Sequence, residues 1–407
     1  MSDETQPSSP PPDQPPQPAE TDPGGALQMT EEQLAEAKSY GRYDVVCALG
    51  DKALDVAFLA VAALLVARPL DDWLSGYPVL GSYWSLRLLV LFAIVTALHV
   101  CVSAPLSFYS GYVVEHRFKM STLSLRGWLW RYLKRNLLAL ALGSMMMLGL
   151  YWIIWTTGWA WWLAAAGAFF CVAIVLGRLF PVLILPMFFK IEKLDQPELD
   201  ERITRLAQGT GLSIEGAYRI ALSDETVKAN AMLAGMGRTR RVLLGDTLLA
   251  SFSGDEIEVI FAHEIGHHVF GHIRKLIVTG IVGSAAGFFI CDQCLRVFLT
   301  GGGEPVDYKQ MPVYTLPLLM LVLTLFTMLL EPIQNFISRG YERQADRYAL
   351  ERTGLHDAFI SAFRKLAKLN KDDPDPHWLD VLLFHSHPPI AQRLAMADDR
   401  PETADRR

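Results

Sequence analysis

The chain has 407 residues, of which 51% are hydrophobic, and its mean hydropathy of +0.23 lies on the apolar side of zero. A soluble enzyme of this size is normally more polar, so the composition predicts a membrane protein. The net charge of −6 is mild and the basic residues form no dominant patch or tail, which excludes nucleic acid as an expected partner. Five cysteines in so long a chain do not indicate a disulfide framework.

Apolar stretches divide the chain into domains. A polar, proline-rich opening predicts a disordered tail over residues 1–37. Six stretches that are long enough, or nearly so, to cross a bilayer follow at roughly 53–70, 86–105, 137–157, 159–188, 275–298 and 312–337. We therefore expect an N-terminal domain of four spans at 38–188, a second domain at 189–397 that contains two further spans, and a polar tail at 398–407. In the fourth stretch, Pro181 and Pro186 predict a bend or an end.

Basic residues give the spans an orientation. The loop between the second and third spans carries Arg117, Lys119, Arg126, Arg131, Lys134 and Arg135. This excess of positive charge places the loop in the cytoplasm. Counting onward puts the segment 189–274, and everything after residue 338, on the same side. The short loops and alanine-rich spans favour a bacterial inner membrane over the endoplasmic reticulum.

The segment 189–274 predicts a small α+β unit inserted between spans. Residues 196–211 have the pattern of a short amphipathic helix. VKANAMLAG and RRVLLGDTLL are strand-like and are joined by a glycine-bearing turn, which predicts a β-hairpin. A helix is expected to begin near Ser253, because Glu256 three residues later completes a capping box. Residues 376–397 predict a final helical stretch.

The pattern His263-Glu264-Ile265-Gly266-His267 on that helix is the strongest chemical signal in the sequence. Residues four apart lie on one face of a helix, so both imidazoles can reach one metal ion. Glu264 is then placed beside the open coordination position, where it can take a proton from a bound water. The spacing predicts a zinc-dependent hydrolase.

A third ligand is expected from the segment that follows the sixth span. Catalytic zinc usually has three protein ligands and a water. Glu342 begins about one helical turn past the apolar run, which places it near the membrane depth of His267. Asp346 lies one turn beyond Glu342 on the same face and is expected to hold the non-metal nitrogen of a ligand histidine.

HEIGHHVFGH, the YERQAD helix and FHSHPP together resemble the type I CAAX prenyl endopeptidases, which are integral-membrane zinc proteases. SFYSGYVVEHRF at 107–118, and ANAMLAG followed by RRVLLGDTLL, are similar to the same family. The likeness covers most of residues 38–397. Eukaryotic members have seven spans, whereas this sequence predicts six, and the missing span is the first.

The resemblance implies several functional features. It implies one zinc ion per chain and a peptide or protein substrate with a prenylated C-terminus. Asn230 and Ala231 would belong to an edge strand that binds extended substrate by backbone pairing. His387 would face the metal and stabilise the oxyanion of the reaction. His385, two residues away, competes with His387 for this role.

Other polar residues are expected to have no part in catalysis. His268 and His272 lie off the ligand face and are predicted to be packing or surface residues. Cys291 and Cys294 have redox-type spacing but fall near the outer end of the fifth span, where a structural or incidental role is expected.

Two ionisable residues lie in or near the hydrocarbon zone. They are His99 and Arg178, and such groups usually face a bundle interior or a water-filled cavity. They are therefore expected to line a chamber. For Arg178, a position at the lipid edge with its charge reaching the interface is an equal rival.

We expect a mainly α-helical, polytopic membrane protein of about six spans, with a small cytoplasmic α+β insert that carries a thermolysin-like zinc-peptidase site. Its partners would be a peptide or protein substrate and the lipid bilayer, and the sequence leaves the oligomeric state open. One alternative is a heat-shock-type membrane metalloprotease for quality control of membrane proteins. Another is a non-catalytic membrane scaffold or transporter with a structural zinc, against which Glu264 argues because such a site needs no general base.

Overall fold

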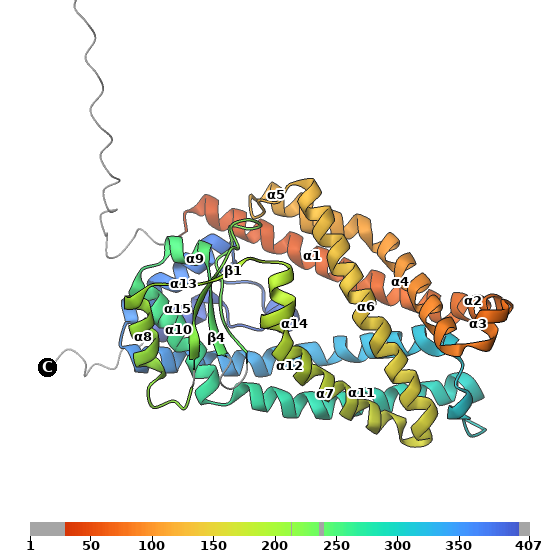
Figure 1. Cartoon of the computed structure of the whole chain (residues 1–407). Helices are drawn as coiled ribbons and strands as arrows, with labels where there is room; N and C mark the ends of the chain where they lie inside the picture. The colour runs from red at the N-terminus through yellow and green to blue at the C-terminus, as the bar shows by residue number, and fades with distance from the viewer. Residues whose placement is uncertain (1–28, 213, 236–239, 399–407) are drawn as a thin grey trace, which may run out of the picture.

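The structure is a computed structural model that describes residues 29–212, 214–235 and 240–398. Long helices run away from a small sheet that lies at one end of the molecule (Figure 1). Helix α1 (Glu31–Val61) continues through a π-helical turn at Ala62–Val66 into α2 (Ala67–Ser75). The short α3 (Pro78–Ser82) leads to α4 (Trp84–Phe108), which is followed by a second π-helical turn, Tyr109–Val114, and α5 (Glu115–Arg117).

Helices α6 (Leu125–Thr157) and α7 (Trp161–Leu179) form a hairpin, with α7 running back beside α6 (Figure 1). Gly158 between them has φ +61°, a conformation that glycine adopts without the clash a Cβ would cause. After α7, a π-helical turn at Phe180–Ile184 and a 3₁₀ turn at Leu185–Met187 replace the regular helix. The end predicted from the two prolines is confirmed.

Five helical segments within the described residues are long and apolar enough to cross a membrane. They are Glu31–Ser75, Trp84–Arg117, Leu125–Met187, His272–Thr300 and Val313–Thr353. The third has 63 residues and folds back at Gly158, so it supplies two crossings and the total agrees with the six predicted spans.

The predicted N-terminal boundary is wrong. Helix α1 begins at Glu31, inside the segment up to residue 37 that was assigned to a disordered tail. Thr30 is the N-cap of this helix and forms a capping box with Gln33. The helix therefore starts at Glu31, inside the segment predicted to be disordered. The rest of that tail, residues 1–28, and the C-terminal tail after Asp398 lie outside the described residues.

A four-stranded sheet has the order β1-β2-β4-β3. Its strands are β1 (Ile191–Lys193), β2 (Ile214–Ile220), β3 (Ala231–Ala234) and β4 (Arg240–Gly245). β3 and β4 pair antiparallel with Ala231 opposite Leu244, so the predicted hairpin is confirmed, although residues 236–239 of its turn lie outside the described part. β3 is an edge strand, because β4 is its only strand partner within the described residues.

Helices surround this sheet and connect it to the membrane. They are α8 (Pro197–Ala207), α9 (Asp246–Ser251), α10 (Gly254–Val269), α11 (His272–Thr300), α12 (Leu316–Thr353), α13 (His356–Asn370), α14 (Trp378–Phe384) and α15 (Ile390–Asp398). α8 confirms the predicted amphipathic helix. The single helical stretch predicted at 376–397 is two helices, α14 and α15, which are separated by a loop at residues 385–389. That loop contains the HSHPP motif.

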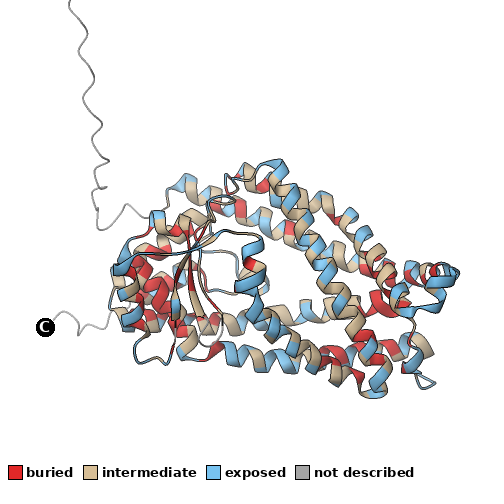
Figure 2. Ribbon diagram, viewed as in Figure 1, coloured by how far each residue is buried: buried red, intermediate tan, exposed pale blue. Residues whose placement is uncertain are grey.

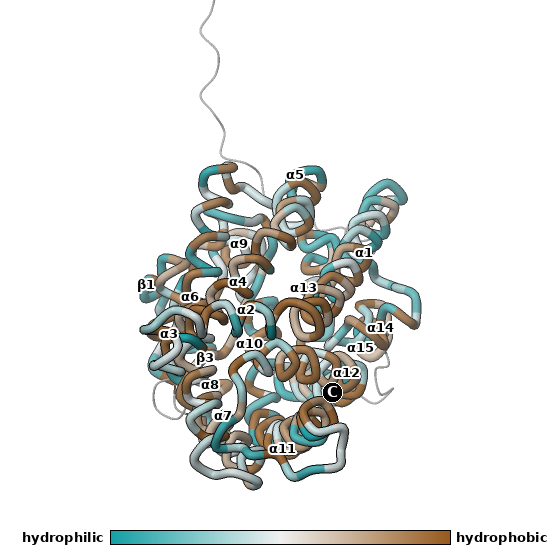
Figure 3. Tube along the Cα trace, turned by 90° about the vertical axis from the view of Figure 1, so that its right-hand side faces the viewer, coloured by the Kyte–Doolittle hydropathy of each residue, from teal (hydrophilic) through white to brown (hydrophobic). Residues whose placement is uncertain are grey.

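Buried residues gather at the two ends of the molecule, while the helices between them are mostly exposed or half-buried (Figure 2). One core, which includes Phe261, Leu244 and Phe359, fills the space between the sheet, α10 and α13. The other, around Trp161 and Tyr151, closes the opposite end. Viewed from that end, hydrophobic segments recur along the helices, as expected where their surface meets lipid (Figure 3).

The start of α10 is fixed by the predicted capping box. Ser253 accepts from the backbone N–H of Glu256, and the Glu256 carboxylate accepts from the backbone N–H of Ser253. Glu256 also accepts from Ser361 and, at 2.8 Å, from Lys365 of α13. Burial alone would raise the pKa of Glu256, but these hydrogen bonds hold it below its usual range. The carboxylate therefore tethers α10 to α13 as an anion.

Gly266 allows α10 and α12 to touch backbone to backbone. A Cβ placed on Gly266 would lie 2.9 Å from the Cα of Ala345, a separation that Cβ atoms essentially never show. Both residues are buried. Any side chain at position 266 would therefore push α10 and α12 apart.

Replacing Gly266 by alanine should destabilise the protein, because overpacking of this kind costs about 1–3 kcal/mol. The measurement is the thermal unfolding midpoint in detergent. The matched control is Gly280→Ala on α11, where a Cβ would meet no heavy atom within 4 Å. That control should be neutral or stabilising, since alanine favours a helix by about 1 kcal/mol over glycine. Equal shifts for the two variants would contradict the packing role of Gly266.

Candidate active site

The structure brings His263, His267 and Glu342 together from α10 and α12. The Nε2 atoms of the two histidines lie 3.1 Å apart. Glu342 Oε2 is 3.3 Å from His263 Nε2, and Glu342 Oε1 is 3.3 Å from His267 Nε2. His263 and Glu342 are buried and His267 is half-buried. One potential ligand atom from each residue lies within 4.8 Å of the other two.

The second nitrogen of His263 is held by Asp346, as the sequence predicted for a ligand histidine. His263 Nδ1 donates to Asp346 Oδ1 at 2.8 Å. Asp346 is fully buried, and Arg393 of α15 neutralises it through hydrogen bonds to both carboxylate oxygens. Arg393 also lies over the ring of Phe363, 3.8 Å from its centroid. Sequence reasoning missed Arg393, although it follows the HSHPP motif closely.

The second nitrogen of His267 is held by His272, which sequence reasoning assigned to packing or the surface. His272 is buried and stacks on Tyr341. Its Nε2 lies 3.0 Å from Gln344 Oε1, which can only accept, so this nitrogen carries the proton. His272 Nδ1 is then an acceptor for His267 Nδ1, 3.0 Å away. With Nδ1 of His267 as the donor, its Nε2 is the nitrogen that faces Glu342 Oε1, 3.3 Å away.

The converging atoms suit a cation. With Nδ1 of His263 and of His267 both donating, their Nε2 lone pairs face each other, an arrangement that is repulsive unless positive charge lies between them. Glu342 Oε2 is buried and has no hydrogen-bond partner among the described residues. Burial alone would lower the pKa of His263, but the nearby carboxylates of Asp346 and Glu342 raise it to about 9. This site therefore favours a positive charge, whether a proton or a metal ion.

The loop between α14 and α15 brings His387, rather than its competitor His385, to these residues. His387 Nε2 lies 3.4 Å from Glu342 Oε2, and its Nδ1 is 3.0 Å from the Ser386 hydroxyl. The His387 side chain remains 61% exposed to a cleft. Arg339 anchors the loop by donating to the carbonyl of His385 at 2.7 Å.

The cleft, of about 510 Å³, runs from Glu264 along the start of the edge strand. Asn230 and Ala231 line it, and the carbonyl of Asn230 accepts from the N–H of Gly245 in β4. Asn370, at the end of α13, binds both backbone groups of the preceding Ala229, with Oδ1 accepting from its N–H at 3.0 Å. The strand at the mouth of the cleft is therefore fixed from both sides.

The remaining polar residues lie apart from this cleft. His268 is half-buried, and burial, with the positive charges of Arg240 and Arg274, lowers its pKa. His99 Nε2 lies 2.7 Å from Asp55 Oδ1 of α1, so it binds one helix of the bundle to another. Arg178 is exposed.

Cys291 and Cys294 do not form a disulfide and both lie on α11. Between them, the buried Asp292 accepts hydrogen bonds from Trp161 and Tyr308, so the polar contacts of this turn close the end of the bundle. Cys291 is buried and Cys294 is half-buried. No strand–helix junction of the thioredoxin kind occurs here, since α11 is continuous.

Comparison with known proteins places this geometry in a family. The profile of peptidase family M48 matches residues 193–401. A second profile, described as the CAAX prenyl protease N-terminal region with five membrane helices, matches residues 19–190. Within that range, the described residues include three of the membrane-crossing helical segments, Glu31–Ser75, Trp84–Arg117 and Leu125–Met187. The third folds back on itself, so the three segments make four crossings.

Several relatives align over most of the chain. The chain is 27% identical to the uncharacterized metalloprotease YhfN of Bacillus subtilis, over 84% of this chain and 80% of that protein. It is 29% identical to CAAX prenyl protease 1 of Saccharomyces cerevisiae, over 76% of this chain and 72% of that protein.

A solved structure shares the fold. The crystal structure of Ste24p from S. mikatae superposes with a TM-score of 0.78 at 25% identity, and the match covers 91% of this chain and 89% of that one. Together with the profile that spans the peptidase half, this likeness shows that the chain belongs to peptidase family M48 and is an integral-membrane metalloendopeptidase similar to the CAAX prenyl proteases.

Proposed function

We propose that this protein is a zinc endopeptidase in which His263, His267 and Glu342 hold one zinc ion and Glu264 is the general base. The observation that carries the proposal is the convergence of two imidazole Nε2 atoms, 3.1 Å apart, on a buried carboxylate whose Oε2 lacks a hydrogen-bond partner among the described residues. Two histidines, one carboxylate and an open position form a set used by catalytic zinc. Asp346 would act by holding His263 in its ligand tautomer.

Different side chains around the cleft would have different roles in peptide hydrolysis. Zinc bound to these ligands would polarise the scissile carbonyl and acidify a bound water. Glu264 would remove the proton of the attacking water and deliver it to the leaving amine. If the Ser386 hydroxyl donates to Nδ1, His387 would carry its proton on Nε2. It would donate this proton in a hydrogen bond to the carbonyl oxygen as negative charge develops there.

Asn230 and Ala231 would hold the substrate in an extended conformation. Among the described residues β3 pairs with β4 alone, so its other edge would offer N–H and C=O groups to a peptide, which would then lie as an added strand. Because Asn370 fixes Ala229, the register of this strand relative to Glu264 is set before substrate arrives. Backbone pairing makes few demands on side chains, so specificity would depend on other parts of the substrate.

Contacts of the basic loop support a cytoplasmic active site. Arg131 pairs with Glu225, and Ser121 forms a β-bridge with Thr226, so the loop between α5 and α6 lies beside the segment that leads to β3. The loop and the cleft therefore share one side of the membrane. Most of the basic residues predicted for this loop lie on the first turns of α6, and their excess at this end of the helix favours the cytoplasm. The inner membrane of a bacterium is the location that we propose.

The substrate class that we propose is a peptide or protein with a prenylated C-terminus. Relatives that align over about three quarters of this chain carry the name CAAX prenyl protease 1. A membrane-embedded bundle next to the cleft suits a substrate that has an apolar chain near the cleaved bond.

Replacing His272 by phenylalanine should weaken zinc binding about 10- to 100-fold, the usual cost of losing an outer hydrogen bond to a ligand histidine. Phenylalanine can keep the stacking on Tyr341 but cannot accept from His267 Nδ1. Competition with a chelator measures the affinity. His272→Gln, whose amide oxygen can still accept, is the control and should retain more affinity. A phenylalanine variant that binds zinc like the wild type would exclude this role.

Glu264→Gln should lower the rate of peptide hydrolysis by about 10²- to 10⁴-fold while leaving zinc content unchanged, because only proton transfer is lost. Hydrolysis is followed with a quenched peptide, and bound metal by elemental analysis. Glu258→Gln, on the same helix but paired with Arg202, should remain active. Normal hydrolysis by folded, zinc-loaded Glu264→Gln protein would refute the general-base assignment.

A farnesylated CAAX peptide should be cleaved at least about tenfold more efficiently than its unprenylated twin, since burial of several CH₂ groups contributes about 0.8 kcal/mol each. The comparison uses kcat/KM in detergent, with a chelated sample as the blank. Equal cleavage of both peptides would leave the peptidase assignment intact. It would overturn the prenyl specificity and favour quality-control proteolysis of membrane proteins.

A further inference from the structure

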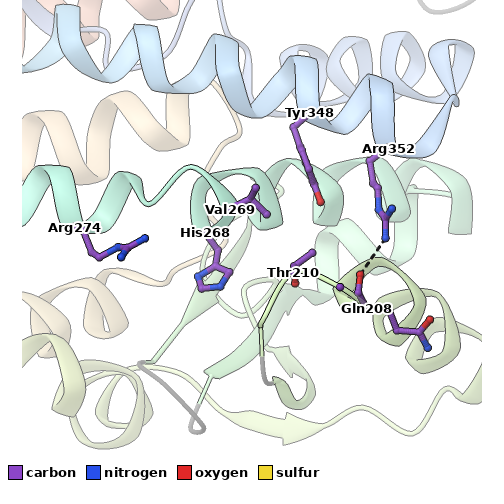
Figure 4. Close-up of a pocket in the computed structure, with 8 residues that line it drawn as sticks. Gln208, Thr210, His268, Val269, Arg274, Tyr348 and Arg352 are labelled. Carbon is purple, nitrogen blue, oxygen red and sulfur yellow. Dashed lines mark hydrogen bonds between the residues drawn. The ribbon is translucent and has the colours of Figure 1, made fainter.

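Four arginines lie on α12, and Arg339 is the one among them that is buried. Arg343 and Arg347 are exposed. Arg352 is exposed too; it lines a pocket that shares no lining residue with the cleft and donates to the carbonyl of Gln208 at 3.2 Å (Figure 4). Arg339 is 6% exposed and forms no ion pair within the described residues. A charge buried without a counter-ion opposes folding, which makes Arg339 a candidate for a role other than stability.

Arg339 holds the C-terminal end of α14. Its Nη1 donates to the carbonyl of Val381 at 2.8 Å and to the carbonyl of His385 at 2.7 Å. One turn earlier on α12, the side chain of Asn335 donates to the carbonyl of Leu383 at 2.9 Å. The last carbonyls of a helix have no partners within it and carry partial negative charge, which a guanidinium group satisfies. The start of the HSHPP loop is therefore fixed to α12.

The other end of this loop is fixed to α12 as well. Arg393, in the first turn of α15, donates to both carboxylate oxygens of Asp346, and its backbone N–H donates to the carbonyl of Pro389 at 3.2 Å. Arg339, Glu342 and Asp346 follow one another at intervals of three and four residues, which places them on one face of α12. The loop thus spans this face and is held about one turn before and one turn after Glu342.

His387 lies in the middle of the loop, and packing alone does not fix its ring, because 61% of the side chain is exposed. Its polar contacts within the described residues are the Ser386 hydroxyl, 3.0 Å from Nδ1, and Glu342 Oε2, 3.4 Å from Nε2. Ser386 alone separates it from His385, whose carbonyl Arg339 holds. The position of the His387 ring relative to Glu342 therefore depends on the backbone at His385.

We propose that Arg339 is a positioning residue for peptide hydrolysis, because it fixes the backbone at His385 and thereby places the His387 imidazole beside the reacting carbonyl. This inference rests on the proposed function, in which His387 stabilises the oxyanion. A hydrogen-bond donor has this effect only when it is already placed where the charge develops. Arg339 does not line the cleft, so it would act through His387 and not on the substrate.

The test is a double-mutant cycle of Arg339→Met and His387→Ala in the detergent-purified full chain. The readouts are kcat and KM for a quenched peptide, together with zinc content. Methionine removes the hydrogen-bond donors and keeps an unbranched side chain. Arg339→Met should lower kcat about 10- to 100-fold, because displacing an active-site group by about 1 Å has an effect of that size. KM and zinc content should stay unchanged, since Arg339 holds neither the edge strand nor a candidate ligand.

The cycle separates a positioning role from a structural one. In the His387→Ala background, Arg339→Met should change kcat by less than about twofold, since residues that act as a unit are not additive. Equal losses with and without His387 would overturn the proposal and leave the zinc peptidase standing. Loss of zinc in Arg339→Met would also overturn it, because the arginine would then act through Glu342. Wild-type kcat in His387→Ala would refute the oxyanion role, and the positioning role with it.

Two further variants complete the experiment. Arg339→Lys keeps the charge and can donate to the same carbonyls, so it should fold and lose less of kcat than Arg339→Met. If Arg339→Met does not fold, the cycle is run with Arg339→Lys, whose loss should likewise disappear in the His387→Ala background.

Arg347→Met is the matched control, because Arg347 is exposed on the same helix and makes no hydrogen bond or ion pair within the described residues. It should keep kcat within about twofold of the wild type, as surface substitutions usually have small effects. An equal loss in Arg347→Met and Arg339→Met would overturn the positioning role in favour of a general effect of charge on α12.

Discussion

The contact between Gly266 and Ala345 is the constraint on which the site depends. His263 and His267 lie on α10, and Glu342 lies on α12, so their polar atoms can meet only if the two helices approach closely. A glycine at position 266 permits backbone contact at the height of the ligands. The capping box at Ser253 and the tether from Glu256 to α13 then fix where α10 begins. The distances between the candidate ligands follow from this packing.

Local patterns predicted the parts of the site that lie on one helix. The HEIGH spacing and the capping box of α10 need only sequence neighbours, and the capping box is confirmed. Arg393 and His272 were missed because their importance comes from contacts between elements. Arg393 lies 47 residues from Asp346, and nothing near it marks a buried charge. His272 was judged by its place on the helical wheel, but α10 ends at Val269, and the turn at Gly271 returns its ring to His267.

Hydropathy located the spans but misjudged where α1 begins. The first turns of α1 are polar, and an apolar run cannot reveal them. They fold because they have tertiary partners: Glu36 pairs with Lys371, and Tyr40 contacts Glu115 and Lys228. The capping box at Thr30 and Gln33 was the one local signal of this start. A helix that rests on another domain therefore extends beyond the segment that its own hydrophobicity would predict.

The same contacts make the membrane domain part of the peptidase site. Lys228 lies three residues before the first residue of β3, and it is held by Tyr40 of α1 and Glu115 of α5. A few residues earlier, Glu225 is held by Arg131 of α6. Both ends of the segment that leads into β3 are thus anchored by residues of the N-terminal spans. Within the described residues, β3 has a strand partner on one side only. These anchors therefore hold the segment before β3 in place, as hydrogen bonds to a second neighbouring strand would in a larger sheet. The peptidase domain and the helical bundle are consequently joined by direct contacts, and helices of the membrane domain fix the segment that leads into β3.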